Sequence, residues 1–191
     1  MPRRDLRRTR TPRGEAATEI DASTWFADEL GALNWRPDGL YVATSTAGRL
    51  ESVEFWRAAA ETGFAFANPR LFPWTLANSP TGSIAKALDV RGPTYTLVGR
   101  ADALVGAFDH ASDDLARELV SSAAVVAVDV ADDRTPSLAA VLVTSPVLAC
   151  QLGIMVEDLE GRGRPSDLLS HVLAHARSAA VERRSLHSGN V

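Results

Sequence analysis

Helical and strand-like segments alternate along most of the chain. From Asp21, large apolar residues recur at helical spacing as far as Leu33, and a Pro-Asp-Gly turn at 37–39 ends this pattern. The run 40–44 is short, apolar and rich in strand-forming residues, which predicts a buried strand. Further helices are expected over about 51–62, 78–89 and 101–119, and further strands over 94–98, 123–130 and 138–143, the last two as a hairpin. This order of elements predicts a layered α/β domain.

One segment, 64–77, is apolar and aromatic but fits neither a long helix nor a central strand, because Pro69 and Pro73 interrupt it. We therefore expect an irregular segment that some other surface has to cover. In the helix before it, which should end at Gly63, the residues expected to face the core are Val53, Phe55, Trp56 and Ala60.

The two ends of the chain differ from its centre in composition. The first 17 residues contain six arginines and two prolines but hardly any large apolar side chain, so we expect a flexible N-terminal arm. Residues 161–165 have the composition of a linker, and Ser166 is the expected cap of a final helix that continues to about 184. The expected division is an arm at 1–17, a domain at 18–160, and a linker, helix and tail at 161–191.

Composition excludes several classes of function. The chain of 191 residues is 46% hydrophobic, which is enough for a core, and its net charge is −4. Because six of its 20 basic residues lie in the arm, the rest is more acidic still, which disfavours a nucleic-acid-binding body. The arm alone could contact nucleic acid or an acidic protein. No apolar stretch approaches the roughly 18–20 residues that span a bilayer, so we expect no membrane partner.

The cysteine and histidine content disfavours a metal centre. A single cysteine, Cys150, excludes an internal disulfide and a cysteine-rich metal site, which favours a cytoplasmic protein, and we expect it to be a small core or half-buried side chain. His171 and His175 lie four residues apart, one turn after Asp167, and could in principle hold a metal ion. The alternative is a solvated helix face. Since the glutamate of a zinc hydrolase motif is missing, we expect neither a metal site nor a cofactor.

The middle of the chain resembles the first half of the β-ketoacyl synthases. The residues that carry this resemblance are PRLFPWTLANSPTG at 69–82, then Ile84, Ala85, Leu88 and the turn Arg91-Gly92-Pro93. In that family, a proline-rich loop at the dimer interface, an Asn-x-x-x-Gly that opens a helix and an Arg/Lys-Gly-Pro turn precede the interface strand. The resemblance covers about 39–144 and implies the N-terminal half of a thiolase-like fold.

The resemblance also implies that the chain cannot condense acyl groups by itself. In a ketosynthase, the nucleophilic cysteine lies at the N-terminus of a buried helix, where backbone N–H groups and the helix dipole stabilise the thiolate. Counting from Gly92-Pro93 places Ala101 at this position, and neighbouring Arg100 and Asp102 cannot form a thioester instead. The histidines that assist decarboxylation belong to the second half of that fold.

Loss of the cysteine is typical of the chain-length factors of type II polyketide synthases, and a truncated factor resembles those of polyene-forming clusters. Such a subunit pairs with a catalytic ketosynthase in a heterodimer, closes the tunnel that holds the growing acyl chain, and meets the acyl carrier protein only indirectly. The implied tunnel and interface residues are Phe72, Trp74, Thr75, Leu76, Tyr95 and Leu97. A covered loop and an interface strand would leave an apolar patch on the isolated chain, so a partner is expected. The alternative is a small acyl-thioester enzyme that uses a residue other than cysteine.

Overall fold

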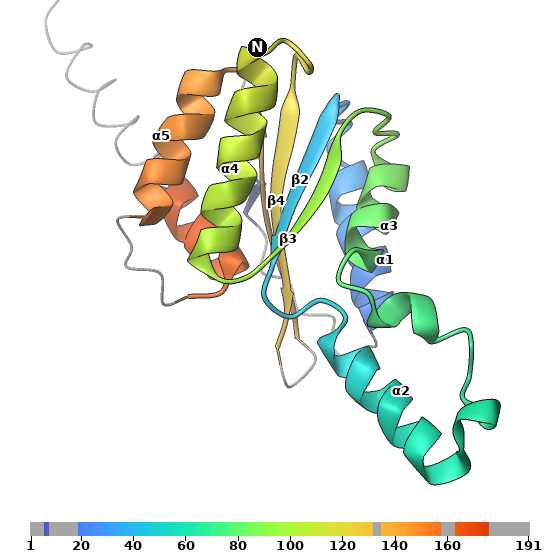
Figure 1. Cartoon of the computed structure of the whole chain (residues 1–191). Helices are drawn as coiled ribbons and strands as arrows, with labels where there is room; N and C mark the ends of the chain where they lie inside the picture. The colour runs from blue at the N-terminus through green and yellow to red at the C-terminus, as the bar shows by residue number, and fades with distance from the viewer. Residues whose placement is uncertain (1–5, 8–18, 132–134, 158–162, 176–191) are drawn as a thin grey trace, which may run out of the picture.

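A central β-sheet with helices on both faces forms the body of the protein (Figure 1). The computed structural model describes residues 6–7, 19–131, 135–157 and 163–175. In chain order the elements are β1 (Leu6–Arg7), α1 (Glu19–Gly31), β2 (Gly39–Thr44), α2 (Arg49–Thr62), the 3-10 helices η1 (Phe64–Phe66) and η2 (Phe72–Thr75), α3 (Ser79–Ala87), β3 (Thr94–Val98), α4 (Ala101–Ala116), β4 (Ala123–Val130), β5 (Pro136–Val143) and α5 (Pro146–Glu157). Residues 165–175 are also helical. The predicted α/β class is confirmed.

The sheet is mixed, with four main strands and the two-residue β1, in the order β1-β5-β4-β2-β3. β2 lies between β3 and β4 and is parallel to both, so that Tyr41 of β2 is in register with Tyr95 on one side and with Val125 on the other. β4 and β5 form the predicted antiparallel hairpin. β1 pairs with the outer edge of β5, whereas β3 forms the other edge of the sheet.

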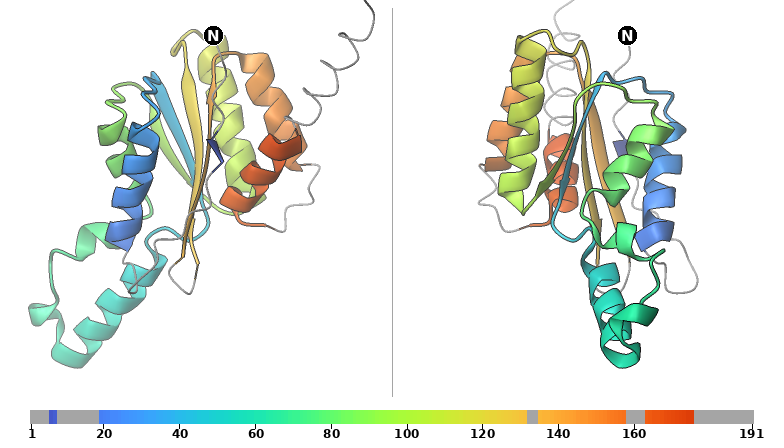
Figure 2. Two further views of the ribbon diagram at one scale, coloured as in Figure 1. Left: turned by 180° about the vertical axis from the view of Figure 1, so that it is seen from behind. Right: turned by 45° about the vertical axis from the view of Figure 1, so that its right-hand side comes forward.

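The helices cover the sheet from both sides, with α1 and α3 on one face and α4, α5 and 165–175 on the other (Figure 2). β2 and β4 are buried along their whole length, which explains why these strands are continuous apolar runs rather than alternating ones. One apolar cluster lies on each face. Phe26, Leu30 and Ile84 are fully buried in the first, and Leu104 and Phe108 in the second.

The sequence located these elements to within a few residues. α1 begins at Glu19, two residues before the expected start, and α3 ends at Ala87 rather than at about 89. Gly63 ends α2 as expected, because its positive φ of 90° is a conformation that side chains with a Cβ rarely adopt.

The expected core face of α2 is wrong. α2 and residues 63–77 leave the sheet and extend away from the body (Figure 1), and we call residues 49–77 the projection. The buried residues of α2 are Glu51 and Ala59, whereas Val53, Trp56 and Ala60 are exposed and Phe55 is only half-buried. Helical spacing shows that apolar residues share a face, but it does not show that the chain has another element to place against that face. Within the described residues, the segment 64–77 is likewise not covered.

Two expectations for the C-terminal part are also wrong. The final helix begins at Pro165 in the described residues, so Ser166 lies inside its first turn and its hydroxyl makes no hydrogen bond with the described residues. Cys150 is exposed on α5 because Ala149, Leu152 and Val156 are the residues that α5 turns toward the core. The part of the predicted helix after residue 175 lies outside the described residues. So does the predicted N-terminal arm, apart from Leu6–Arg7, which form β1.

A buried carboxylate, Asp129, joins three parts of the body at the end of β4. Its Oδ1 accepts hydrogen bonds from the backbone N–H of Ser45 (2.8 Å) and from the Ser45 hydroxyl (2.7 Å), both in the loop that follows β2. Its Oδ2 accepts a hydrogen bond from the backbone N–H of Ser166 (3.0 Å), in the first turn of the final helix. Asp129 therefore holds this helix and the β2 loop to the hairpin, and its buried charge is satisfied by donors.

Candidate partner-binding surface and nucleophile position

The helix predicted to start near residue 101 begins at Ala101, the residue that the family resemblance would place at the nucleophile position. β3 leads through Gly99 and Arg100 into α4, and Ala101 is the first residue of that helix. The Ala101 side chain is buried, as are Ala103 and Leu104 in the same turn. The first residue of α4 is therefore buried and carries only a methyl group.

The start of α4 holds a carboxylate that the sequence analysis did not assign a role. Asp102 Oδ1 accepts a hydrogen bond from the backbone N–H of Arg100, at 2.8 Å. A Cβ atom on Gly99 would lie 2.8 and 2.9 Å from the two Asp102 oxygens, so the carboxylate rests directly on the glycine. The available signal was an acidic residue in the first turn of a predicted helix, where the helix dipole favours a negative charge.

β3 leaves one side of its backbone without a partner strand in the described part of the chain. The N–H of Leu40 donates to the carbonyl of Pro93, and the N–H of Gly99 donates to the carbonyl of Thr44 (both 2.9 Å). Since backbone groups alternate in direction along a strand, Tyr95 and Leu97 bond toward β2, and the backbone of Thr94, Thr96 and Val98 points outward. Three residues therefore offer backbone donors and acceptors at this edge of the sheet.

The two predicted interface residues of β3 point toward α4. The Tyr95 ring is stacked between Tyr41, with ring centroids 5.5 Å apart, and His110, with centroids 5.0 Å apart. Tyr95 remains exposed, whereas Leu97 is half-buried against the core. Of the interface pair predicted on β3, Tyr95 is therefore the one that a partner could readily reach.

Tyr41 is the buried member of this ring stack. Its hydroxyl donates a hydrogen bond to Asp114 Oδ2 at 2.7 Å, and both side chains are buried. Burial raises the pKa of Tyr41 strongly, and the hydrogen bond and negative charge of Asp114 raise it further, so the phenol keeps its proton. The Tyr41 ring that stacks against Tyr95 is therefore neutral, and its hydrogen bond to Asp114 fixes its orientation.

The projection carries a continuous row of aromatic rings, which we call the aromatic ridge: Phe64, Trp56, Phe55 and Phe72. Successive ring centroids lie 5.4, 5.8 and 6.0 Å apart, in edge-to-face arrangements. All of them except the half-buried Phe55 are more than half exposed. Phe66, beyond the end of the ridge, is 80% exposed. The sequence pattern did not predict Phe64 and Phe66 at the surface, and the prediction of Trp56 in the core is wrong.

The four predicted tunnel residues lie together at η2 on the projection. Phe72 and Leu76 are exposed, whereas Trp74 and Thr75 are half-buried. The Ser52 hydroxyl of α2 donates to the carbonyl of Thr75 at 3.2 Å and so fixes η2 against α2. The structure thus gathers these four residues at the end of the ridge that Phe72 forms, and leaves Tyr95 and Leu97 on the sheet edge.

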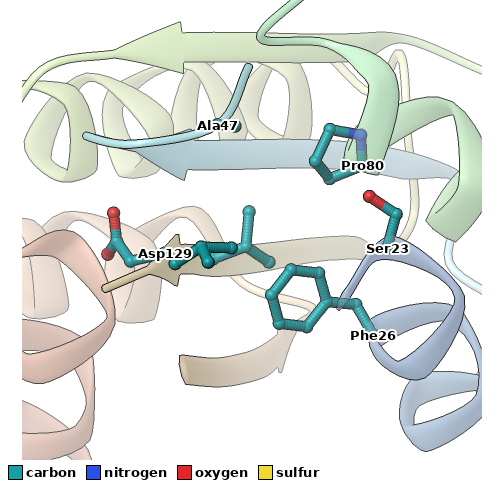
Figure 3. Close-up of a pocket in the computed structure, with 7 residues that line it drawn as sticks. Ser23, Phe26, Ala47, Pro80 and Asp129 are labelled. Carbon is teal, nitrogen blue, oxygen red and sulfur yellow. The ribbon is translucent and has the colours of Figure 1, made fainter. Parts of the chain in front are cut away.

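A small pocket lies elsewhere, between α1, the start of α3 and the end of β4 (Figure 3). Its lining residues are Ser23, Phe26, Ala47, Pro80, Val128, Asp129 and Val130. The Ser23 hydroxyl is buried there without a hydrogen-bond partner among the described residues, and the Asp129 carboxylate on its rim is already bonded to Ser45 and Ser166. None of the six predicted tunnel and interface residues lines this pocket.

The described residues contain no group of three or more histidine, cysteine or acidic side chains that could hold a metal ion. His171 and His175 are both exposed, with ring centroids 5.4 Å apart, which agrees with a solvated helix face. No helix in the described ranges is both long and apolar enough to cross a membrane. Comparison of the sequence with models of known families and with curated proteins gives no match.

Proposed function

We propose that this chain is a non-catalytic subunit of the chain-length-factor type. It pairs with a catalytic ketosynthase and shapes the tunnel for the acyl chain in polyketide or polyene biosynthesis. The observation that carries the proposal is the exposed aromatic ridge, on a chain whose helix start at Ala101 has no nucleophile.

The ridge supports a protein partner because soluble monomers rarely expose contiguous aromatic surface of this kind. Covering apolar surface releases about 25 cal/mol per Å². Tryptophan and other large aromatic side chains concentrate binding energy in protein interfaces. The edge-to-face contacts also hold the rings in place before binding, which lowers the entropy cost of ordering them.

The edge of β3 supports a partner that contributes a strand. Outward-facing backbone groups at Thr94, Thr96 and Val98 can pair with an extended segment, and such pairing gives affinity through main-chain hydrogen bonds. At the other edge of the sheet, β1 pairs with Ala139 and Ala140 of β5. A ketosynthase of the same half-fold would bring an equivalent edge strand, which makes it the partner we assign.

Co-expression with a ketosynthase tests the pairing. We expect a stable 1:1 complex that Val98→Asp disrupts, because the new charge would be buried at the strand edge. The matched control is Val147→Asp on α5, since Val98 and Val147 are both 63% exposed and α4 separates α5 from β3 (Figure 1). Trp56→Ala should weaken the complex at least tenfold in dissociation constant, as is common for a central aromatic residue. A soluble, stable monomer that ignores the ketosynthase would exclude the proposal.

Product analysis tests the tunnel role. Phe72→Ala or Trp74→Ala, in a complex that still assembles, should lengthen or broaden the product chains without stopping condensation, because bulky rings limit the space for carbon atoms. Phe66→Ala, outside η2, is the control and should leave the products unchanged. An unaltered product profile in both η2 variants would remove these residues from the tunnel. Covalent acylation of the isolated chain by an acyl carrier protein would instead indicate a stand-alone thioester enzyme.

A further inference from the structure

We infer that His171 and His175 form a surface site for a divalent transition-metal ion that prefers imidazole ligands, such as Zn²⁺, Ni²⁺ or Cu²⁺. The site lies on the exposed side of the helix at 165–175, which is red in Figure 2. The residues that we assign to the pairing with a ketosynthase lie on other elements, so the inference goes beyond the proposed function.

The helix that carries the two histidines is fixed in its rotation by its buried side. Leu169 and Val172 are buried in the apolar cluster on this face of the sheet. At the first turn, the backbone N–H of Ser166 donates to Asp129 Oδ2, at 3.0 Å. The two histidines therefore face outward together, one turn apart, on an element that packs against the body. Ligands held on such an element are close to each other before an ion arrives.

The distance between the two rings suits the coordination of one ion. Their centroids lie 5.4 Å apart. Two imidazoles that bind the same ion through nitrogen, with bonds of about 2.1 Å and a tetrahedral angle, have centroids about 5 Å apart. The rings are stacked, with an angle of 23° between their planes, so each ring has to turn before one nitrogen of each meets the same ion. Both side chains are exposed and can turn without a change in the backbone.

The site is an open one, with two ligands from the described part of the chain. The described residues contain no group of three or more histidine, cysteine or acidic side chains that could hold an ion. Water or a group from another molecule therefore completes the coordination, in contrast to the four protein ligands of a structural zinc site. Asp167, exposed one turn before His171, adds a negative charge that attracts a cation to this side of the helix. The missing glutamate argues against a zinc hydrolase motif, which is a different kind of site.

Titration of the full chain with Zn²⁺ or Ni²⁺ in a calorimeter tests the site, and Mg²⁺, which prefers oxygen ligands, is the negative control. Cys150 is changed to serine in every variant, because an exposed thiol can also bind these ions. His171→Ala and His175→Ala should each raise the dissociation constant about tenfold or more, because the second imidazole then no longer adds to the first. The matched controls change the other two of the chain's four histidines, as His110→Ala and His187→Ala, and should leave the binding unchanged.

Hydrogen exchange locates the ion without a change at the site. An ion that joins two side chains one turn apart holds that turn closed, so exchange of the backbone N–H groups between 171 and 175 should slow when Zn²⁺ is added. The inference is overturned if the Cys150→Ser chain binds neither Zn²⁺ nor Ni²⁺, if binding is unchanged in His171→Ala and His175→Ala, or if Zn²⁺ leaves the exchange of this turn unchanged. None of these results depends on whether a ketosynthase binds, so the two proposals fail separately.

Discussion

The body and the projection contain similar side chains but place them in opposite environments. Phe26 and Phe108 of the body are buried, whereas Phe64, Phe66 and Phe72 of the projection are exposed. Their hydrophobicity is the same, so it does not decide their environment. The difference arises because the body has a sheet with two faces to cover, and the projection contains only one helix and two short 3-10 turns.

Neighbouring elements decide which helix becomes part of the core. α4 packs against β2, β4 and α5, and its small residues, such as Ala107 and Ala111, allow these elements to approach closely. α2 packs mainly against η1 and η2, which follow it directly in the chain. A helix that meets only its own continuation cannot bury a wide apolar face, so the projection leaves that face exposed.

Removing a ring from the body should have the largest effect on stability. Phe108 is fully buried in the cluster between the sheet and α5. Phe108→Ala removes its contacts and leaves a cavity, so we expect a loss of about 3–5 kcal/mol in the free energy of unfolding. Chemical denaturation followed by circular dichroism measures it. A loss below about 1 kcal/mol would mean that the body is loosely packed, contrary to the comparison.

Asp129 tests whether the body is held by its polar network as well as by its core. Asp129→Ala leaves the Ser45 and Ser166 backbone donors unsatisfied in a buried place, so we expect a loss of about 2–3 kcal/mol. The control is Ser45→Ala, which removes one hydroxyl hydrogen bond and should cost only about 1 kcal/mol. Equal losses in the two variants would show that the hydrogen bonds from the Ser45 and Ser166 backbone N–H groups contribute nothing to stability.

Tyr41 tests the support beneath the sheet edge. Tyr41→Phe removes the hydroxyl that donates to buried Asp114, so we expect a loss of about 1–2 kcal/mol in thermal or chemical unfolding. The matched change is Tyr95→Phe, on the neighbouring strand, where the exposed ring stacks with Tyr41 and His110. That variant should change stability by less than about 0.5 kcal/mol. A smaller loss for Tyr41→Phe than for Tyr95→Phe would contradict the assigned hydrogen bond.

The body could largely be predicted from the sequence, and the surface could not. Apolar runs such as 123–130 and 138–143 are stable only as strands of a sheet covered on both faces. Their place in the sheet could therefore be predicted from the apolar pattern alone. The prediction that Trp56 faces the core is wrong, because helical periodicity does not show which element, if any, packs against a helix. Asp129 and its partner Ser45 are 84 positions apart in sequence, and only the folded chain brings them together. The helix start at Ala101 could be predicted because it depends on residues that are neighbours in the sequence. The contact of the Asp102 carboxylate with Gly99 could not, because it depends on the backbone geometry of the folded chain.

The smallest expected effect comes from the projection and completes the comparison with Phe108. Phe66→Ala removes the same atoms as Phe108→Ala, but Phe66 is 80% exposed and loses few contacts. The free chain should therefore change in stability by no more than about 0.5 kcal/mol, measured by the same denaturation. A loss above about 2 kcal/mol would mean that the projection packs against another surface in solution, such as a second copy of the chain. Dilution separates these cases, because a loss that depends on protein concentration arises between molecules, whereas a constant one arises within a single chain.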